Sequence, residues 1–138
     1  MKFRRPTQLH ICGTNYQTGK FTIHRKTIGK RMTAKLKEIR AQLRKRMHDR
    51  VPGTVKWLQQ VVRGYFQYHA VPGNQARLWA FRGEVLRSWL KALRRRSQRR
   101  RMSWERLKAR LEPLIPPIQV LHPYPSERFN AKFCPYPR

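Results

Sequence analysis

Negative charge is the scarcest feature of this sequence. Its 138 residues include only 6 aspartates and glutamates, and Asp49 is the single aspartate. The glutamates stand apart from one another along the chain. Phosphoryl transfer with two metal ions needs clustered carboxylates, and glycoside hydrolysis needs a pair of them. The sequence therefore argues against both kinds of active site, and it predicts no catalytic residue, no metal site and no cofactor.

Cysteine and long apolar runs are also scarce. Cys12 and Cys134 lie far apart in the sequence, and nothing indicates export, so a disulfide between them has no support. The N-terminal residues carry charge but no apolar stretch typical of a signal peptide. No apolar run approaches the length needed to cross a membrane. We therefore expect a protein of the reducing cytoplasm that does not enter a membrane.

Positive charge, in contrast, is abundant. Lysine and arginine number 33, which gives a formal net charge of +27. A compact chain with this charge repels itself unless a polyanion neutralises it, and solubility alone needs far less charge. Nucleic acid and an anionic membrane surface are the candidate partners. Arginine outnumbers lysine by 22 to 11, and because guanidinium groups bind phosphate in a fork and stack on bases, nucleic acid is favoured.

The pattern of apolar residues predicts a mainly α protein with one domain. We expect a helical bundle of three to four helices, preceded by a short β-hairpin and followed by a proline-rich C-terminal tail. The hairpin is indicated by alternating apolar and polar residues around a glycine-containing turn. The predicted segments are a divergent N-terminal segment (1–7), the hairpin (8–27), the helical domain (28–115) and the tail (116–138).

Breaks in the helical pattern predict where the helices begin and end. Apolar residues at spacings of three and four predict a first helix over 28–48. A turn over 49–53 should follow, with Thr54 capping the second helix. Asn74 is the expected cap of a third helix that runs into the arginines after residue 93, and Ser103 the cap of a short fourth one. Trp104, Leu107, Leu111 and Leu114 should face inward.

Basic residues on these helices are the candidate contacts to nucleic acid. They are densest over 91–110, where ten of the twenty residues are lysine or arginine. A solvated charged surface is the alternative explanation. Tyr65 and Tyr68 are candidates for stacking on unpaired bases, with core packing as the alternative. The predicted RNA-binding residues are Arg31, Lys35, Arg40, Arg44, Arg63, Tyr65, Tyr68, Arg94, Arg95, Arg96, Arg99, Arg100 and Arg101.

Other local features have weaker implications. Gly64, in the middle of the second helix, costs about 1 kcal/mol relative to alanine, which close packing of another helix or of an RNA backbone would justify. The four tryptophans are expected in the core or at a partner interface. A zinc site on His10, Cys12 and His24 is disfavoured because zinc ligands usually come in closely spaced pairs. A nucleophilic cysteine lacks an orienting acid.

Five short stretches occur in order along the chain: 10–13 (HICG), 19–27 (GKFTIHRKT), 61–74 (VVRGYFQYHAVPGN), 89–101 (WLKALRRRSQRRR) and 121–125 (LHPYP). This series resembles the thumb/maturase (X) domain at the C-terminal end of bacterial group II intron reverse transcriptases. The resemblance implies a thumb-like helical domain that grips structured intron RNA and assists its splicing. The polymerase palm with its metal-binding aspartates is absent, so the alternatives are an accessory subunit that completes a separate palm-containing reverse transcriptase chain, or a non-functional remnant.

Overall fold

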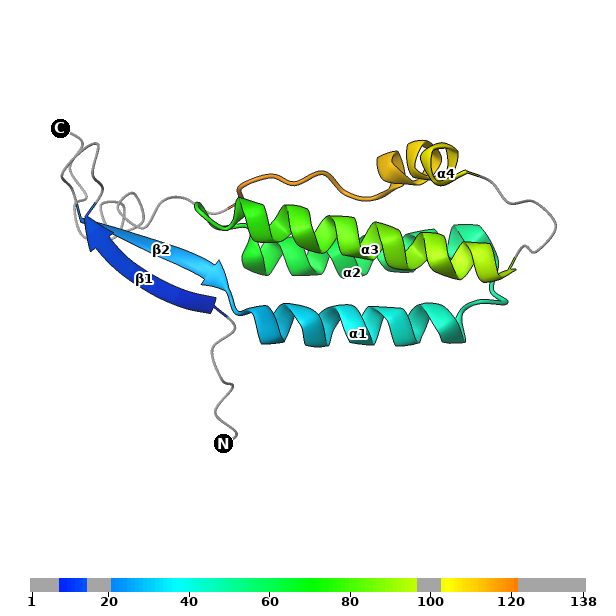
Figure 1. Cartoon of the computed structure of the whole chain (residues 1–138), viewed down its shortest axis with the longest axis horizontal. Helices are drawn as coiled ribbons and strands as arrows, with labels where there is room; N and C mark the ends of the chain where they lie inside the picture. Colours follow the sequence, from blue (N-terminus) through cyan, green and yellow to red (C-terminus); the bar gives the residue numbers. More distant parts are fainter. Residues whose placement is uncertain (1–7, 15–20, 97–102, 122–138) are drawn as a thin grey trace.

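Helices make up most of the chain, as the sequence predicts. The computed structural model describes residues 8–14, 21–96 and 103–121; for 8–14 and 21–26 it describes the backbone alone. Four α-helices are found in these ranges. The elements, labelled in Figure 1, are β1 (Gln8–Thr14), β2 (Phe21–Thr27), α1 (Gly29–Lys45), α2 (Val51–His69), α3 (Gln75–Arg96), α4 (Trp104–Leu111) and a 3-10 turn, η1 (Glu112–Leu114).

The three long helices lie side by side and alternate in direction along the chain. α1 and α3 run the same way, and α2 runs back between them in sequence (Figure 1). α1 packs closely against α3 along its length. The short α4 lies near the C-terminal end of α3, and residues 115–121, which we call the strap, return along the bundle toward β2 (Figure 1).

β1 and β2 form an antiparallel pair beyond one end of the bundle (Figure 1). The register runs from Gln8 opposite Thr27 to Thr14 opposite Phe21. Two strands alone are marginally stable in water, so this pair depends on what it is attached to. Its attachment to the bundle is at Thr27, the last residue of β2, which is buried.

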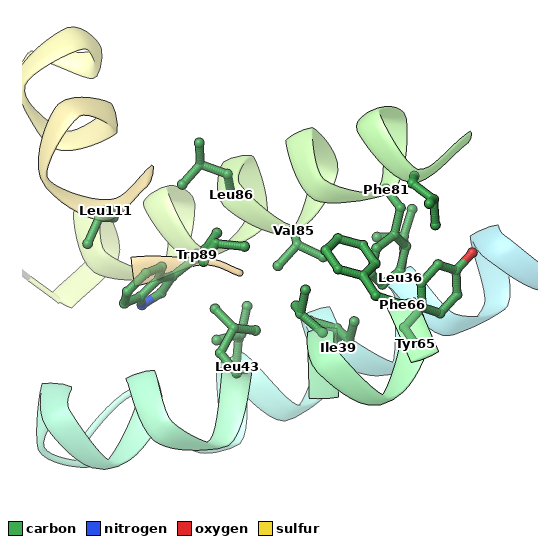
Figure 2. Packing of buried hydrophobic residues seen from close by; sticks show 14 of the residues in the cluster. Leu36, Ile39, Leu43, Tyr65, Phe66, Phe81, Val85, Leu86, Trp89 and Leu111 are labelled. Carbon is green, nitrogen blue, oxygen red and sulfur yellow. The ribbon is translucent and has the colours of Figure 1, made fainter. Parts of the chain in front are cut away.

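The core lies where α1, α2 and α3 meet, and Figure 2 shows part of it. The apolar residues recur at helical spacings on each helix, which turns one stripe of each toward the shared interior. Trp89 of α3 is the largest of the side chains that are almost completely buried. The other main contributors are Leu36, Ile39, Leu43, Leu58, Val62, Phe66, Leu78, Phe81, Val85, Leu86 and Leu90, with Leu111 and Ile115 covering one side.

The boundaries of the first two helices differ from the prediction. α1 ends at Lys45 rather than at residue 48, and α2 begins at Val51, inside the predicted turn. Pro52 does not prevent this, because the first turn of a helix needs no N–H bond there and the fixed φ of proline suits it. Arg50, not Thr54, occupies the N-cap position, and the Thr54 hydroxyl donates to the carbonyl oxygen of Arg50.

The fourth helix begins where the sequence predicts. The Ser103 hydroxyl accepts a hydrogen bond from the backbone N–H of Arg106, which satisfies a donor in the first turn. Leu111 is buried as expected. Trp104 and Leu114, however, are 37% and 38% exposed, so the prediction that they face inward is wrong. A helix of 8 residues has about two turns, so only one narrow edge of it reaches the core.

The strap is held on the bundle by polar side chains that bind its carbonyl groups. Arg82 of α3, whose side chain is 12% exposed, donates to the carbonyl oxygens of Glu112, Ile115 and Pro116 and pairs with the Glu112 carboxylate. Gln59 of α2 donates to the Leu114 carbonyl oxygen over 2.8 Å. These bonds satisfy backbone acceptors in a segment that has no regular ladder of its own.

A buried polar cluster joins β2 to the ends of α2 and α3. The Asn74 side chain accepts from the Thr27 N–H over 3.0 Å, and its amide donates to the Thr27 hydroxyl and to the His69 carbonyl oxygen, each over 2.8 Å. The Thr27 hydroxyl and His69 Nδ1 share a further hydrogen bond over 3.3 Å. Asn74 precedes α3 as predicted, but its side chain serves as this junction.

Replacing Asn74 with alanine should destabilise the protein by about 2–4 kcal/mol, because buried donors and acceptors of Thr27 and His69 lose their partners. Chemical denaturation measured by circular dichroism tests this. The exposed neighbour Gln75, replaced with alanine, is the control and should change stability by less than about 0.5 kcal/mol. Equal stability of the two variants would show that the cluster does not hold the junction.

Stability should also fall in mild acid. Burial lowers the pKa of His69 from 6.5 to about 4. Between these two pH values the imidazole is protonated in the unfolded chain but neutral in the folded protein. The stability due to neutral His69 is complete above pH 6.5 and is lost as the pH falls toward 4, by up to about 3 kcal/mol. Denaturation of wild type and His69→Gln at pH 7 and pH 4.5 measures this. The variant, which cannot titrate there, should lose less stability than wild type; equal losses would contradict the assignment.

Candidate nucleic-acid interface

A groove with basic walls runs between α1 and α3. Its volume is about 280 Å³, and we call it the α1–α3 groove. Arg40 and Arg44 line it from α1, and Lys91 and Arg95 line it from α3. All four residues are exposed to solvent. The remaining lining residues are Leu43, Met47, Ser88 and Ala92.

Helical spacing explains the two rows of positive charge. Arg40 and Arg44 are four residues apart on α1, and Lys91 and Arg95 are four apart on α3, so each pair lies on one face of its helix. The small side chains of Ser88 and Ala92 allow the two helices to approach closely along this line. Because α1 and α3 run in the same direction (Figure 1), the two rows extend side by side.

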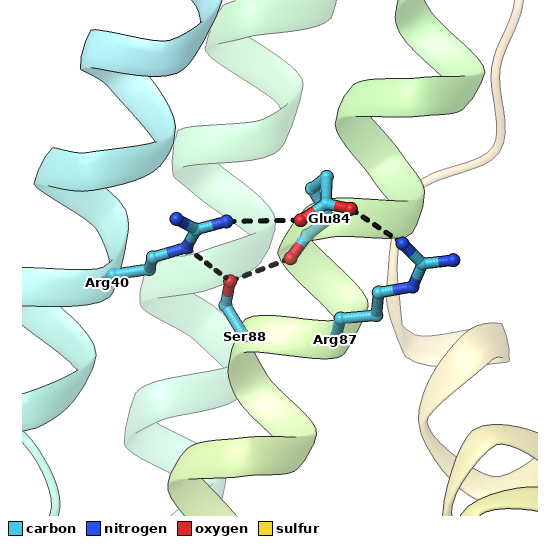
Figure 3. Close-up of polar contacts among 4 residues, drawn as sticks. All are labelled: Arg40, Glu84, Arg87 and Ser88. Carbon is cyan, nitrogen blue, oxygen red and sulfur yellow. Dashed lines mark hydrogen bonds and ion pairs between the residues drawn. The ribbon is translucent and has the colours of Figure 1, made fainter.

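One carboxylate closes an end of the groove. Glu84 Oε2 lies 3.1 Å from Arg40 Nη2, and Glu84 Oε1 lies 2.7 Å from Arg87 Nη1. Ser88 accepts from Arg40 Nε over 3.2 Å and donates to the Glu84 carbonyl oxygen over 2.7 Å. Figure 3 shows these four residues. The bonds fix the Arg40 guanidinium, although such half-exposed ion pairs contribute little to stability.

The groove is suited to a chain of phosphates. Arg44, Lys91 and Arg95 have no ion-pair partner among the residues that the structure describes. Lysine and arginine in this arrangement bind a polyanion by displacing its condensed counterions. Within the described ranges no three side chains of His, Cys, Asp or Glu gather as a metal ion would require. The lining of the groove thus presents cationic side chains of the kind that an anion requires.

The predicted RNA-binding residues do not form one surface. Arg40, Arg44 and Arg95 line the α1–α3 groove. Arg31, Lys35, Tyr65 and Tyr68 line a separate hollow between α1 and α2. The sequence does not indicate which neighbouring helix each side of α1 faces, so it could not predict this division.

The other predicted residues are more scattered. Arg63 lies beside the strap, near Pro116 and Pro117. Arg96 donates to the Asp49 carbonyl oxygen over 2.6 Å and so braces the turn between α1 and α2. Arg94 is exposed on the outer side of α3, while Arg99, Arg100 and Arg101 lie outside the described residues.

Two contributors to the groove were missed. Lys91 belonged to the dense basic segment but was not selected, and Glu84 was read only as an isolated acid. The signal that finds Lys91 is its spacing of four from both Arg87 and Arg95, which places all three on one face of α3. Glu84 carries no such signal, since its partner Arg40 is distant in sequence.

The two candidate stacking tyrosines have different environments. Tyr65 is 8% exposed and its ring stacks on Phe81, with centroids 3.7 Å apart and planes 9° from parallel. Burial raises the pKa of its phenol. Tyr68 is 60% exposed and meets the His69 ring edge to face. The Tyr65 ring also lies 4.2 Å from the His69 ring. Tyr65 is therefore part of the core, whereas Tyr68 lies largely at the surface.

The tryptophans are divided between core and surface. Trp89 is in the core as predicted, and Trp57 is partly buried beneath the Arg46 guanidinium, 4.9 Å from its ring centroid. Trp79 is 60% exposed, with Arg82 near its ring. Trp104 is also exposed, and neither of these two tryptophans lines the α1–α3 groove.

Comparisons with protein-family models, curated proteins and solved structures found no match to this chain. The resemblance to group II intron maturases therefore stays a prediction from short sequence stretches. Among the helices that the structure describes, none combines the length and the apolar composition needed to cross a membrane.

Removing the acid at the end of the groove should strengthen polyanion binding. Glu84→Gln leaves Arg40 and Arg87 without their carboxylate partner, so both become available to phosphate. We expect affinity for a phosphate polymer to rise about two- to fivefold at low salt. Glu105→Gln, an exposed change of equal charge on α4, is the control. If both variants elute from phosphocellulose at the same salt concentration, the position of Glu84 has no special importance.

Proposed function

We propose that this protein is a non-catalytic RNA-binding module that holds backbone phosphates in the α1–α3 groove. The observation that supports this most directly is the pair of basic rows, Arg40 and Arg44 opposite Lys91 and Arg95. Because both rows lie on helices rather than on loops, the backbone that carries these cations is already in place when a phosphate chain binds. The net charge of +27 supplies the long-range attraction that brings such a ligand to the surface.

An anionic membrane surface is a poorer ligand for the same charge. Interfacial helices present an apolar face to the lipid beside their basic residues. Here the apolar faces of α1 and α3, which include Ile39 and Val85, are buried against each other and α2. The basic rows therefore lack the exposed apolar band that would anchor them in lipid.

The choice of RNA and of a maturase role rests on the sequence resemblance. Phosphate contacts alone do not distinguish RNA from DNA or one sequence from another. A thumb-like arrangement of helices with a hairpin and a proline-rich tail, acting in the cytoplasm, would grip structured group II intron RNA and assist its splicing. The helices carry no catalytic metal site in this proposal, because the protein positions the RNA rather than cleaving it.

A second candidate is an accessory subunit that completes a separate, palm-containing reverse transcriptase chain. The feature that favours it is the β1–β2 pair, which is a sheet of only two strands in the part of the chain that the structure describes. Edge strands readily pair with another chain. Co-purification with a palm-containing chain in the absence of RNA would favour this candidate over the first.

The binding proposal is tested by removing the free cations of the groove. The triple variant Arg44→Ala, Lys91→Ala, Arg95→Ala should bind duplex RNA at least about tenfold more weakly at low salt. The slope of log affinity against log salt should fall by about 2–3, since each lost phosphate contact contributes about 0.7–0.9. Filter binding over a range of salt concentrations measures both quantities.

The matched control for that experiment removes the same charge elsewhere. Lys56→Ala, Arg106→Ala, Arg110→Ala changes three exposed cations on α2 and α4, and circular dichroism should show both triple variants folded. The control should keep most of the affinity. If the two triple variants lose affinity equally, binding depends on total charge alone and the groove is not the site.

A further inference from the structure

The hollow between α1 and α2 is distinct from the α1–α3 groove. Its volume is about 550 Å³, which lies within the range of small-ligand pockets in proteins. Thr27, Tyr65, Tyr68 and His69 line one part of it. The rest of the lining consists of Arg31, Ala34, Lys35, Glu38, Gln60, Val61 and Gly64. Since none of its residues lines the α1–α3 groove, the proposed backbone contact leaves this hollow unexplained.

The two ends of the hollow differ in chemistry. α2 runs against α1, so the start of α1 with Arg31 lies beside the end of α2 with Tyr65 and Tyr68 (Figure 1). Glu38 is two turns further along α1, about 10 Å away, where it pairs with Lys35 over 3.1 Å. One end therefore combines aromatic rings with a guanidinium, and the acid lies toward the other end.

Gly64 keeps the hollow open. A Cβ built at this position would meet nothing within 4 Å in the part of the chain that the structure describes, so no described helix or core residue requires glycine here. Of the two justifications for this glycine, close packing of another helix is therefore not found among the described residues, and close approach of an RNA backbone stays a prediction. A glycine inside a helix is normally a cost, and its lack of a side chain in the lining leaves room for a ligand beside Tyr68.

The wall is rigid and has unmet hydrogen-bonding capacity. Tyr65 is fixed by its stacking on Phe81, and its buried hydroxyl has no hydrogen-bond partner within the described part of the chain. Burial raises the pKa of this phenol, and the nearby Thr27 hydroxyl opposes that rise. His69 is neutral at pH 7 and offers no positive charge to a phosphate, so this wall is better suited to an uncharged base.

We propose that the hollow receives one unpaired nucleotide of the bound RNA, with its base against Tyr68 and its phosphate at Arg31. Aromatic side chains beside a cation are the usual means by which proteins hold splayed-out bases. The inference rests on the proposed function for its ligand, but it concerns a different face of α1. It predicts that the protein prefers RNA with a bulged nucleotide to fully paired RNA.

The test compares two RNA duplexes that differ by a single bulged 2-aminopurine nucleotide. Wild type should bind the bulged duplex about tenfold more tightly than the paired one. The fluorescence of the 2-aminopurine should change on binding, because its base leaves one stacked environment for another. Gly64→Leu, which fills the hollow without meeting other atoms close to its Cβ, should lose this preference and keep the affinity for the paired duplex. Tyr68→Ala should do the same.

The control is Gly83→Leu, which places the same side chain at an equally open glycine on α3 and should keep the preference. A preference that survives in both Gly64→Leu and Tyr68→Ala, or its absence in wild type, would overturn the inference. Free adenosine monophosphate that displaces the bulged base at micromolar concentration would also overturn it, in favour of a soluble nucleotide. Failure of the proposed function can be distinguished from failure of this inference, because it would abolish binding of the paired duplex as well.

Discussion

The structure depends on how a chain with +27 net charge places its 6 acidic residues. Three of them lie at junctions: Glu84 joins α3 to α1, Glu112 joins η1 to α3, and Asp49 pairs with Arg46 beside the turn between α1 and α2. A fourth, Glu38, pairs with Lys35 within α1. Each ion pair is weak where it is exposed. Together they hold cations where elements meet, and the remaining surplus charge is left at the surface.

Helix α1 presents its share of this surplus positive charge on two separate sides. One side carries Arg40 and Arg44 toward α3, the opposite side carries Arg31 and Lys35 toward α2, and the apolar stripe with Ile39 lies between them in the core. The bundle thus separates a basic groove from a basic and aromatic hollow. We infer that the first binds the regular backbone and the second a single irregular nucleotide.

The sequence predicted the features that depend on local pattern. Period 3.6 located the helices and most of the core, and the Ser103 cap is confirmed, because amphipathicity and capping are properties of neighbouring residues. The start of α2 was misplaced because Pro52 is both a turn residue and a good first-turn residue. Arg40 pairs with Glu84, 44 positions away, and which helix each side of α1 faces also depends on long-range contacts. Local pattern encodes neither of these.

The most direct test of the account is thermal unfolding at several salt concentrations, with and without duplex RNA. If surplus positive charge opposes the fold and a polyanion relieves it, salt alone should raise the melting temperature, and RNA should raise it strongly in dilute buffer and progressively less as salt increases. A melting temperature that RNA leaves unchanged in dilute buffer, or raises by the same amount at every salt concentration, would contradict it.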